Sequence, residues 1–460
     1  MQRTDSGSAL RPWLGEARAL VALALPLVAG NLAWSTIAAT DLLLLGRLGS
    51  RAVAAGALAL NIYTAFMIFG IGLTNAASPL IAAERGRRRH SVRDIRRTVR
   101  QTLWAGAMIC VPSWLILWHG EALLILLGQE PALATEAGKL LRGLQWALLP
   151  YFAFLTLRNF VTALERPLSA VIVIALTIPV NLAAGWILIF GKLGMPALGL
   201  FGAGLASTLS SLFMLAAMIL AVLTDRNFRR YHLFGRLWVP DWPRFRAVWR
   251  IGLPIAVIQG LEVTVFNAAV FLMGLIDAAS LAAHAVAIQI ASLSFMVPMG
   301  IGQAGTVRVG LAYGRGDHAA LGRAGWSALA LGALYALVAA AIILAVPQLL
   351  VSVFLDVAAP ANAEVVRLAC IFLAVAAVFQ LSDCIQAIGA GILRGIQDTR
   401  VPMIFAGIGY WVIGIGVGTA LAFPLGMKGT GVWIGLATGL TVVAVLLLAR
   451  WHRREALIGA

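Results

Sequence analysis

The sequence predicts an all-α polytopic membrane protein, with twelve transmembrane helices in two six-helix lobes related by internal duplication. Of its 460 residues, 61% are hydrophobic and 12% are charged, whereas a soluble protein carries about 25% charged residues. The apolar stretches are continuous and reach the ~20 residues that a helix needs to cross a bilayer. A β-barrel is disfavoured, because its strands alternate apolar and polar residues over only ~10 positions.

The apolar stretches define twelve expected spans. Six lie in the first half of the chain, at residues 19–46, 52–82, 102–119, 139–164, 168–190 and 201–223. Six lie in the second half, at residues 251–276, 280–311, 326–347, 365–393, 401–423 and 430–449. The expected organisation is a cytoplasmic N-terminal lead (1–17), an N-lobe (18–224), a basic cytoplasmic linker (225–250), a C-lobe (251–450) and a cytoplasmic tail (451–460).

Basic residues gather in alternate loops. The net charge of +16 would also suit a nucleic-acid-binding protein, but the arginines lie in short loops between spans. Residues 84–101 hold eight arginines against two acids, and the linker and the tail are also basic. Cytoplasmic loops of membrane proteins carry such an excess of Lys and Arg. With twelve spans, every basic loop falls on one side, which predicts that both termini and the linker are cytoplasmic.

The two halves of the chain repeat one another. At a shift of 228 residues Pro26 matches Pro254 and Gly72 matches Gly300, and after Arg394 the shift becomes 232. A constant shift across five pairs of spans indicates a duplication, and six spans per half make the two copies parallel. Such internal repeats are typical of transporters, whose sites lie near the bilayer midplane between the repeats.

Three acids lie inside the expected spans, at Asp41, Glu262 and Asp383. A charge at the centre of a spanning helix costs roughly 2.5–3.5 kcal/mol on insertion scales, and such residues usually mark ion or substrate paths. None of the three is repeated in the other half, although the surrounding scaffold is. They are therefore candidate cation or proton sites, and the alternative is that each only hydrogen-bonds a neighbouring helix. Glu262 and Asp383, in the same half, are a candidate pair for sharing a proton or a sodium ion.

Other polar and aromatic residues within or between the spans are candidates for lining a cavity or contacting a substrate. Isolated polar side chains in a bundle also often just bridge two helices, with a contribution of about 0.6 kcal/mol each. The candidates are Trp34, Asn181, Phe266, Asn267, Gln289, Asp356 and Gln380.

The sequence lacks the motifs of several enzyme classes. It has no GxxxxGK[ST] loop for ATP, no HExxH and no CxxC. Five of the six histidines fall in loops, at span ends or in the tail, and His284 is expected to be a packed polar residue. We therefore expect no catalytic residue, no enzyme activity and no cofactor other than a coupling ion.

Several stretches resemble the multidrug and toxic compound extrusion (MATE) family across nearly all of residues 16–449. They are ALPLVAGNLAWSTIAATDLLLLGRLG, LPIAVIQGLEVTVFNAAVFLMGLI, FQLSDCIQAIGAGILRGIQDTRVPM and VNLAAGWILIFGKLGMPALGLFGAGLAS. The joint presence of Glu262 and Asp383 is similar to the NorM-type branch of the family, whereas the DinF-type branch relies on the first-half aspartate.

The resemblance implies a two-lobed exporter that moves organic cations and drugs outward in exchange for sodium ions or protons. It implies that Asp41, with Asn181 near it, is a first-lobe proton or substrate acid, and that Glu262 and Asp383 form the second-lobe cation site. Gly185 stands where many relatives have another polar residue, so the first-lobe ion site is incomplete. Asp356 resembles a loop acid that contacts drugs.

The expected location is the bacterial inner (plasma) membrane, and the expected partners are small organic cations and the lipid bilayer, with no nucleic acid and no second subunit. The alternative function is a flippase for lipid-linked sugars of the same superfamily. A flippase for anionic lipids is expected to line its cavity with arginines, and the one basic residue that we place inside a span is Arg158.

Overall fold

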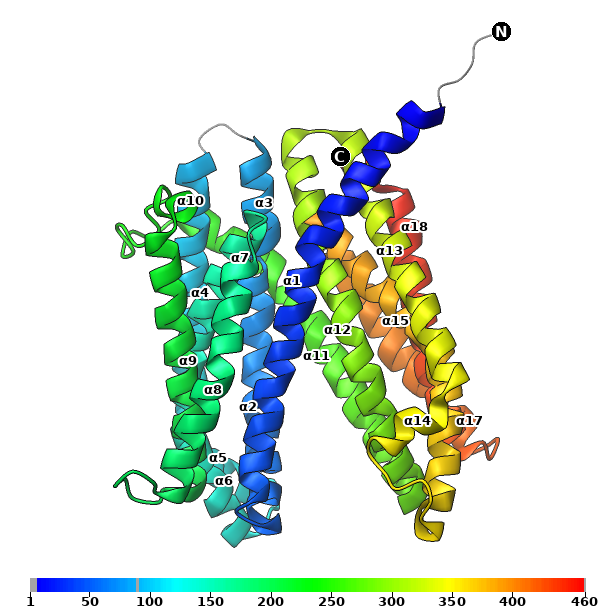
Figure 1. Ribbon diagram of the computed structural model, residues 1–460. Helices are drawn as coiled ribbons and strands as arrows, with labels where there is room; N and C mark the ends of the chain where they lie inside the picture. Colours follow the sequence, from blue (N-terminus) through cyan, green and yellow to red (C-terminus); the bar gives the residue numbers. More distant parts are fainter. Residues whose placement is uncertain (1–5, 88–90, 459–460) are drawn as a thin grey trace. The chain divides into compact units, whose positions relative to one another are not determined.

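The computed structural model describes residues 6–87 and 91–458, and this part of the chain forms helices joined by short loops, with no strand (Figure 1). Twelve helical segments in it are long and apolar enough to cross a membrane. The twelve predicted spans are therefore confirmed. Most of the helices extend past the predicted ends, because a change to polar residues ends an apolar run without breaking the backbone hydrogen bonds of the helix.

The helices form two compact units, which are described separately. The N-unit is Ala29–Ala256. Beside the later part of α1 (Ser6–Gly46) and the start of α11 (Trp242–Ile276), it contains α2 (Ser50–Asn75), α3 (Ala77–Arg87), α4 (Ser91–Trp118), α5 (Gly120–Leu126), α6 (Pro131–Leu144), η1 (Gln145–Ala147), α7 (Leu148–Ala163), α8 (Leu168–Phe190), α9 (Gly199–Thr224) and α10 (Arg226–Arg229).

The C-unit consists of the described residues up to Val28 and those from Val257 onward. Besides its parts of α1 and α11, it contains α12 (Ala278–Arg315), α13 (His318–Ala345), α14 (Pro347–Ser352), η2 (Pro360–Asn362), α15 (Ala363–Gly395), α16 (Arg400–Ala406), the π-helical η3 (Gly407–Ile415), α17 (Gly416–Ala422), α18 (Lys428–His452) and α19 (Arg454–Ile458).

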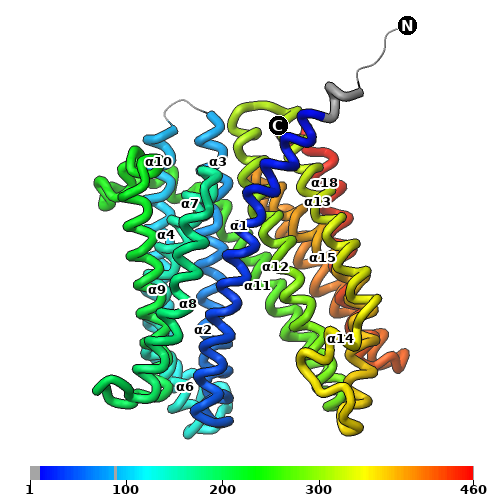
Figure 2. Tube along the Cα trace, viewed as in Figure 1, coloured from blue at the N-terminus to red at the C-terminus, as the bar shows by residue number. Residues whose placement is uncertain are grey.

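Two helices, α1 and α11, are each divided between the two units; both can be followed along the Cα trace (Figure 2). Helix α1 changes unit after Val28 and α11 changes unit after Ala256, so the two crossings obey the repeat shift of 228 residues. The lobes predicted at residues 18–224 and 251–450 divide the chain according to its sequence repeat. That division remains a prediction. By packing, the segment before Ala29 belongs with the second half and the linker belongs with the first.

The N-terminal lead is largely helical, where the sequence predicted only a polar segment before the first span. Helix α1 has 41 residues and is therefore about 60 Å long at 1.5 Å per residue, twice the ~30 Å hydrocarbon core. Within the C-unit, Arg308 Nη2 lies 2.6 Å from Oε2 of Glu16. Leu20 and Leu23 are buried. The early part of α1 is thus fixed by the ion pair at Glu16 and by apolar packing at Leu20 and Leu23.

Helix ends of the C-unit carry capping residues. The backbone N–H of Ser280 donates to Oδ1 of Asp277 at 2.6 Å, and this hydrogen bond holds the pKa of Asp277 below its usual range. The same arrangement opens α13, where Ala320 N donates to Oδ1 of Asp317 at 2.8 Å. Such caps satisfy backbone donors that a helix leaves free at its first turn. Gly316 ends α12 in the left-handed conformation that glycine favours.

Helix α15 is the most enclosed helix of the C-unit, since it packs against α12, α13 and α18. Its backbone touches that of α12: a Cβ added to Gly391 would lie 2.5 Å from the carbonyl oxygen of Gly302. The Thr306 hydroxyl lies 2.8 Å from the carbonyl oxygen of Gly391. Small residues permit this close approach of membrane helices.

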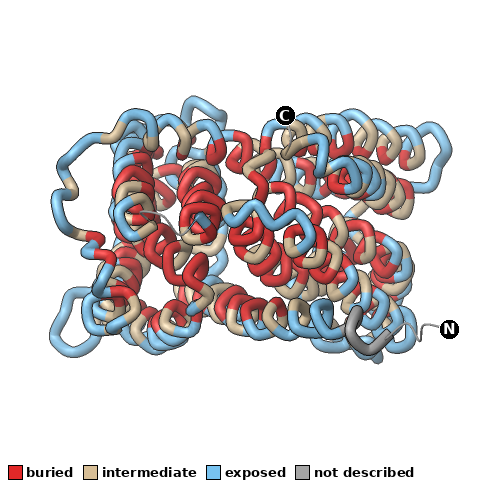
Figure 3. Tube along the Cα trace, turned by 90° about the horizontal axis from the view of Figure 1, so that it is seen from above, coloured by how far each residue is buried: buried red, intermediate tan, exposed pale blue. Residues whose placement is uncertain are grey.

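Viewed along the helices, buried residues lie between neighbouring helices and exposed ones on the outside (Figure 3).

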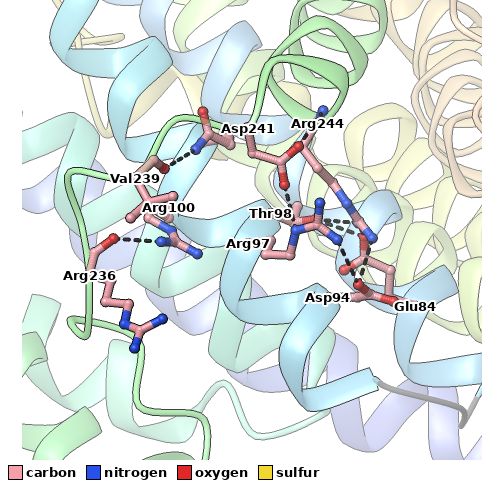
Figure 4. Close-up of polar contacts among 10 residues, drawn as sticks. Glu84, Asp94, Arg97, Thr98, Arg100, Arg236, Val239, Asp241 and Arg244 are labelled. Atoms are coloured by element: carbon pink, nitrogen blue, oxygen red, sulfur yellow. Dashed lines mark hydrogen bonds and ion pairs between the residues drawn. The ribbon is translucent and has the colours of Figure 1, made fainter.

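The two basic segments of the N-unit meet at one end of the bundle (Figure 4). Arg97 Nε donates to Oδ2 of Asp241 at 2.5 Å, and Arg244 forms ion pairs with Glu84 and Asp94. Thr98 also donates to Oε1 of Glu84, at 2.7 Å. These contacts join α3 and α4 to the start of α11, so the sequence-distant helix ends around Glu84 and Arg97 are held to the segment around Asp241.

We expect Glu84→Gln to lower the melting temperature of the protein. Glu84 is only 5% exposed, and losing one partner of a buried ion pair costs about 3–5 kcal/mol because the other charge is left uncompensated; Asp94 remains near Arg244, so the loss should be at the lower end. The control is Glu130→Gln, whose pairing with Arg51 at 3.7 Å is well exposed. Thermal unfolding in detergent measures both, and equal melting temperatures for the two variants would contradict the expectation.

Candidate functional site

The N-unit contains a partly open cavity of about 270 Å³ with Asp41 on its wall. Helix α1 supplies Asp41 and Trp34, α8 supplies Asn181, and α9 supplies Ser207. Trp34 and Asp41 are seven residues apart, which is two helical turns, and so they face the same space. The structure thus brings together three of the residues that the sequence singled out.

Asp41 is held by two side-chain hydrogen bonds. Asn181 Nδ2 donates to Oδ1 at 3.0 Å, and the Ser207 hydroxyl donates to Oδ2 at a longer 3.4 Å. Asn181 is 1% exposed, and its Oδ1 has no partner in the described part of the chain. The sequence reasoning missed Ser207, although it belongs to a polar group with Ser210 and Ser211 on the otherwise apolar α9.

Aromatic rings form another part of this cavity wall. Trp34 stacks on Tyr151 with ring centroids 4.7 Å apart, and Tyr63 also lines the cavity. Aromatic faces attract organic cations when water is excluded, with energies of about 2 kcal/mol or more. A carboxylate beside stacked aromatic rings is therefore suited to a positively charged, partly apolar ligand.

A basic residue outside the wall of this cavity is hydrogen-bonded to a neutral amide. Arg158 Nη2 donates to Oδ1 of Asn31 at 2.8 Å. None of the residues that line the Asp41 cavity is an arginine or a lysine. The cavity therefore presents a carboxylate and aromatic rings without a positive side chain on its wall.

The C-unit holds the other two acids, Glu262 on α11 and Asp383 on α15. Glu262 lines a small space of about 10 Å³ with Phe266 and Tyr410. Asp383 is 4% exposed, and it lies within electrostatic range of Glu262. The pair that the sequence proposed is thus brought together in one unit.

Polar atoms around Asp383 are unsatisfied in the described residues. Oδ1 of Asp383, Nε2 of Gln380 and Oε1 of Gln386 are buried and have no hydrogen-bond partner there. Buried polar groups in folded proteins nearly always have a partner, so such a cluster requires an explanation, for example a water molecule or an ion. Oxygen atoms of carboxylates and amides are the ligands that hard cations prefer.

Two further residues of this site were missed by the sequence reasoning. Arg394 lies on α15 within electrostatic range of Glu262, which corrects the prediction that Arg158 is the one basic residue inside a span. The sequence did contain a signal for Arg394. It lies one residue beyond the predicted end of its span, and about three helical turns after Asp383 on the same helix. Tyr410 lies in the π-helical segment Gly407–Ile415, and such segments are frequent at functional sites.

The remaining predicted residues lie in different environments. Phe266 contacts Phe379 edge to face, with centroids 6.2 Å apart, and Gln380 is buried. Asn267, Gln289 and Asp356 are exposed and line neither cavity. Asp356 caps its own loop by accepting a hydrogen bond from Ala358 N at 3.0 Å. Within the described residues no cluster of three or more His, Cys, Asp or Glu side chains is suited to a metal.

Twelve membrane-length helices in a duplicated chain, with an acid inside a span in each unit, define the class as a multi-pass helical transporter. The MatE family model matches residues 26–187 and again residues 254–420, starting points that are separated by the repeat shift of the sequence. The chain belongs to the MatE family, the multidrug and toxic compound extrusion transporters.

Relatives with this fold span nearly the whole chain. A probable multidrug resistance protein NorM of Mesorhizobium japonicum is 54% identical over 96% of this chain and 95% of its own length. A protein of the same name from Brucella suis is 49% identical over 97% and 95%. The predicted resemblance to the family and to its NorM-type members is confirmed.

Solved structures show the same fold at low sequence identity. The eukaryotic MATE transporter AtDTX14 superposes with a TM-score of 0.82 at 22% identity, over 95% of both chains. A MATE family transporter of the MOP superfamily in an outward-facing conformation superposes with a TM-score of 0.85 at 19% identity, over 100% of both chains. These likenesses confirm the predicted fold class.

Proposed function

We propose that the chain is a secondary active multidrug efflux antiporter, which exports organic cations and drugs in exchange for sodium ions or protons. The observation that carries the proposal is the presence of an unrepeated acid site in each unit of a duplicated membrane bundle. Membership of the MatE family and the similarity to proteins named as probable multidrug resistance proteins support the same function.

The different sizes of the two sites support a division of roles. The Asp41 cavity, of about 270 Å³, is close to the lower end of the ~300–1,000 Å³ typical of ligand pockets. The space at Glu262, of about 10 Å³, is close to the ~10–15 Å³ that one water molecule needs. We therefore assign organic cations to Asp41 and its aromatic wall, and the coupling ion to Glu262 and Asp383.

The proposed exchange requires that the two sites be coupled through the conformation of the protein. Binding of sodium or a proton at Glu262 and Asp383 favours a conformer that binds the organic cation less tightly, and the cation is released outward. Thermodynamic reciprocity then makes drug binding weaken ion binding by the same factor. The positive charge of Arg394, within electrostatic range of Glu262, opposes binding of a cation there and so favours release of the ion into the cytoplasm.

We place the protein in the bacterial inner membrane as a monomer, with both termini in the cytoplasm. Two basic segments meet at one end of the N-unit, and an excess of basic residues is typical of the cytoplasmic side. The flippase alternative is disfavoured, because neither acid cavity has an arginine in its wall, whereas a lipid diphosphate calls for several.

The proposal is tested by drug efflux from liposomes that contain the purified chain. We expect a fluorescent organic cation to be exchanged against an inward sodium gradient at clamped pH, or against a proton gradient in sodium-free buffer. Asp41→Asn should raise KM for the cation at least tenfold, since it removes the negative charge of the cavity. Glu130→Gln, which removes the same charge from an exposed acid of the same unit, should leave KM unchanged. Transport driven by neither gradient would contradict the proposal.

A further inference from the structure

An exposed face of the N-unit carries a groove that is basic at one end and apolar along the rest. Its basic part has a volume of about 840 Å³. Five arginines line it, Arg93, Arg96, Arg97 and Arg100 from α4 and Arg236 from the segment before α11. Asp241 is the one acid on this wall, and it pairs with Arg97. The basic part is thus strongly cationic, and it lies beside the contacts drawn in Figure 4.

Four of the five groove arginines, all but Arg97, form no ion pair with an acid in the described part of the chain. Within the described residues, Arg93, Arg96 and Arg236 form no ion pair. Arg100 is 6% exposed, and its Nη1 donates only to the neutral carbonyl of Arg236, at 2.5 Å. Its buried Nε has no acceptor. A largely buried guanidinium with an unused donor, among other arginines, requires an anion.

The apolar part continues from the basic part and shares Pro240 and Trp242 with it. It has a volume of about 690 Å³. On α4 it is lined by Trp104, Met108 and Val111, which are 41%, 58% and 55% exposed. These residues follow Arg100 at spacings of four, four and three, so they form one stripe on one helix face.

The length of the stripe agrees with one leaflet of a bilayer. Eleven residues separate Arg100 from Val111, which is about 16 Å at 1.5 Å per residue. Half of the hydrocarbon core is about 15 Å. Trp104 Nε1 donates to the carbonyl of Leu237 at 2.7 Å, where the basic part gives way to the apolar part. Tryptophan is typical of the membrane–water interface.

We propose that this groove, the α4 groove, binds a phospholipid with an anionic headgroup. The lipid phosphate accepts hydrogen bonds from the arginines, whose planar forks suit phosphate oxygens, and an acyl chain lies along Trp104, Met108 and Val111. Basic pockets between membrane helices bind anionic headgroups in this way. A soluble phosphate would use the arginines and leave the apolar part empty. No residue of the α4 groove lines either acid cavity, so the site is separate from the proposed exchange.

The test is lipid binding to the delipidated full-length chain in detergent, measured by native mass spectrometry. We expect palmitoyl-oleoyl phosphatidylglycerol to bind more tightly than the phosphatidylcholine with the same chains. The triple variant R93Q/R96Q/R236Q should bind phosphatidylglycerol at least tenfold more weakly, a difference of about 1.4 kcal/mol, with phosphatidylcholine unaffected. Unchanged phosphatidylglycerol binding by this variant would overturn the proposal.

The matched control is R229Q/R246Q/R250Q, which removes the same charge from exposed arginines outside the groove. It should bind phosphatidylglycerol like the wild type. If the control weakened phosphatidylglycerol binding as much as R93Q/R96Q/R236Q does, the effect would be one of overall charge, and the proposed site would be overturned. Ala107→Trp, which fills the apolar part, should also weaken phosphatidylglycerol binding. Displacement of phosphatidylglycerol by an equal concentration of inorganic phosphate would identify a soluble anion as the ligand and overturn the lipid assignment.

Discussion

Glu262→Gln and Asp383→Asn are each expected to abolish gradient-driven drug efflux. Both substitutions keep the shape of the side chain and remove the charge that we propose binds the coupling ion. One ion moved through 100 mV supplies about 2.3 kcal/mol, which corresponds to a roughly 50-fold concentration ratio of drug across the membrane. Loss of one coupled ion removes that factor. The measurement is the steady-state drug gradient in liposomes with an imposed ion gradient and potential.

Drug binding at equilibrium separates a coupling defect from a folding defect. Because Asp41 and its cavity lie in the other unit, both variants should still bind the organic cation in detergent. The control Glu130→Gln, which changes an exposed acid, should retain the wild-type gradient. Gradient-dependent efflux of wild-type size in both Glu262→Gln and Asp383→Asn would rule out this pair as the coupling site.

Gly391→Leu is expected to prevent stable folding of the C-unit. Even a single Cβ at Gly391 would lie 2.5 Å from the carbonyl oxygen of Gly302 and 3.0 Å from its Cα. Backbone atoms of α12 cannot rotate away as a side chain would, so α12 and α15 must separate. Overpacking a well-packed interior typically costs about 1–3 kcal/mol, and a clash between backbones belongs at the upper end of that range.

Gly274→Leu is the matched control, since an added Cβ there meets no atom within 4 Å. It should be produced and unfold like the wild type, whereas Gly391→Leu should give little monodisperse protein and a lower melting temperature. Size-exclusion chromatography and thermal unfolding of the detergent-purified chains measure both. A Gly391→Leu chain as stable as Gly274→Leu would show that α12 and α15 do not need this contact.

The sequence was sufficient for the twelve spans and for the three intramembrane acids. Hydropathy determines which segments enter a bilayer, because a helix satisfies its own backbone hydrogen bonds there. An acid in such a segment is costly, so Asp41, Glu262 and Asp383 were recognisable without a structure. Asn181 was placed near Asp41 by the family resemblance, and the hydrogen bond of 3.0 Å between them agrees with that placement.

The partners of the acids were less predictable, because they depend on how helices face one another. Ser207 is one small polar residue among several on α9, and nothing in its spacing points to Asp41. Arg394 was excluded because the predicted span ended at residue 393, while α15 continues to Gly395. The exposed positions of Asn267 and Gln289 are also set by helix rotation, which composition does not reveal.

The crossings of α1 and α11 between units have a consequence for biosynthesis. Residues 6–28 are synthesised well before their packing partners in the C-unit, which begin at Val257. Arg308, which pairs with Glu16, is synthesised nearly 300 residues later. Residues 6–28 must therefore wait in the translocation machinery or the lipid until residues far along the chain have been made, while the N-unit needs no residue beyond Ala256 to close.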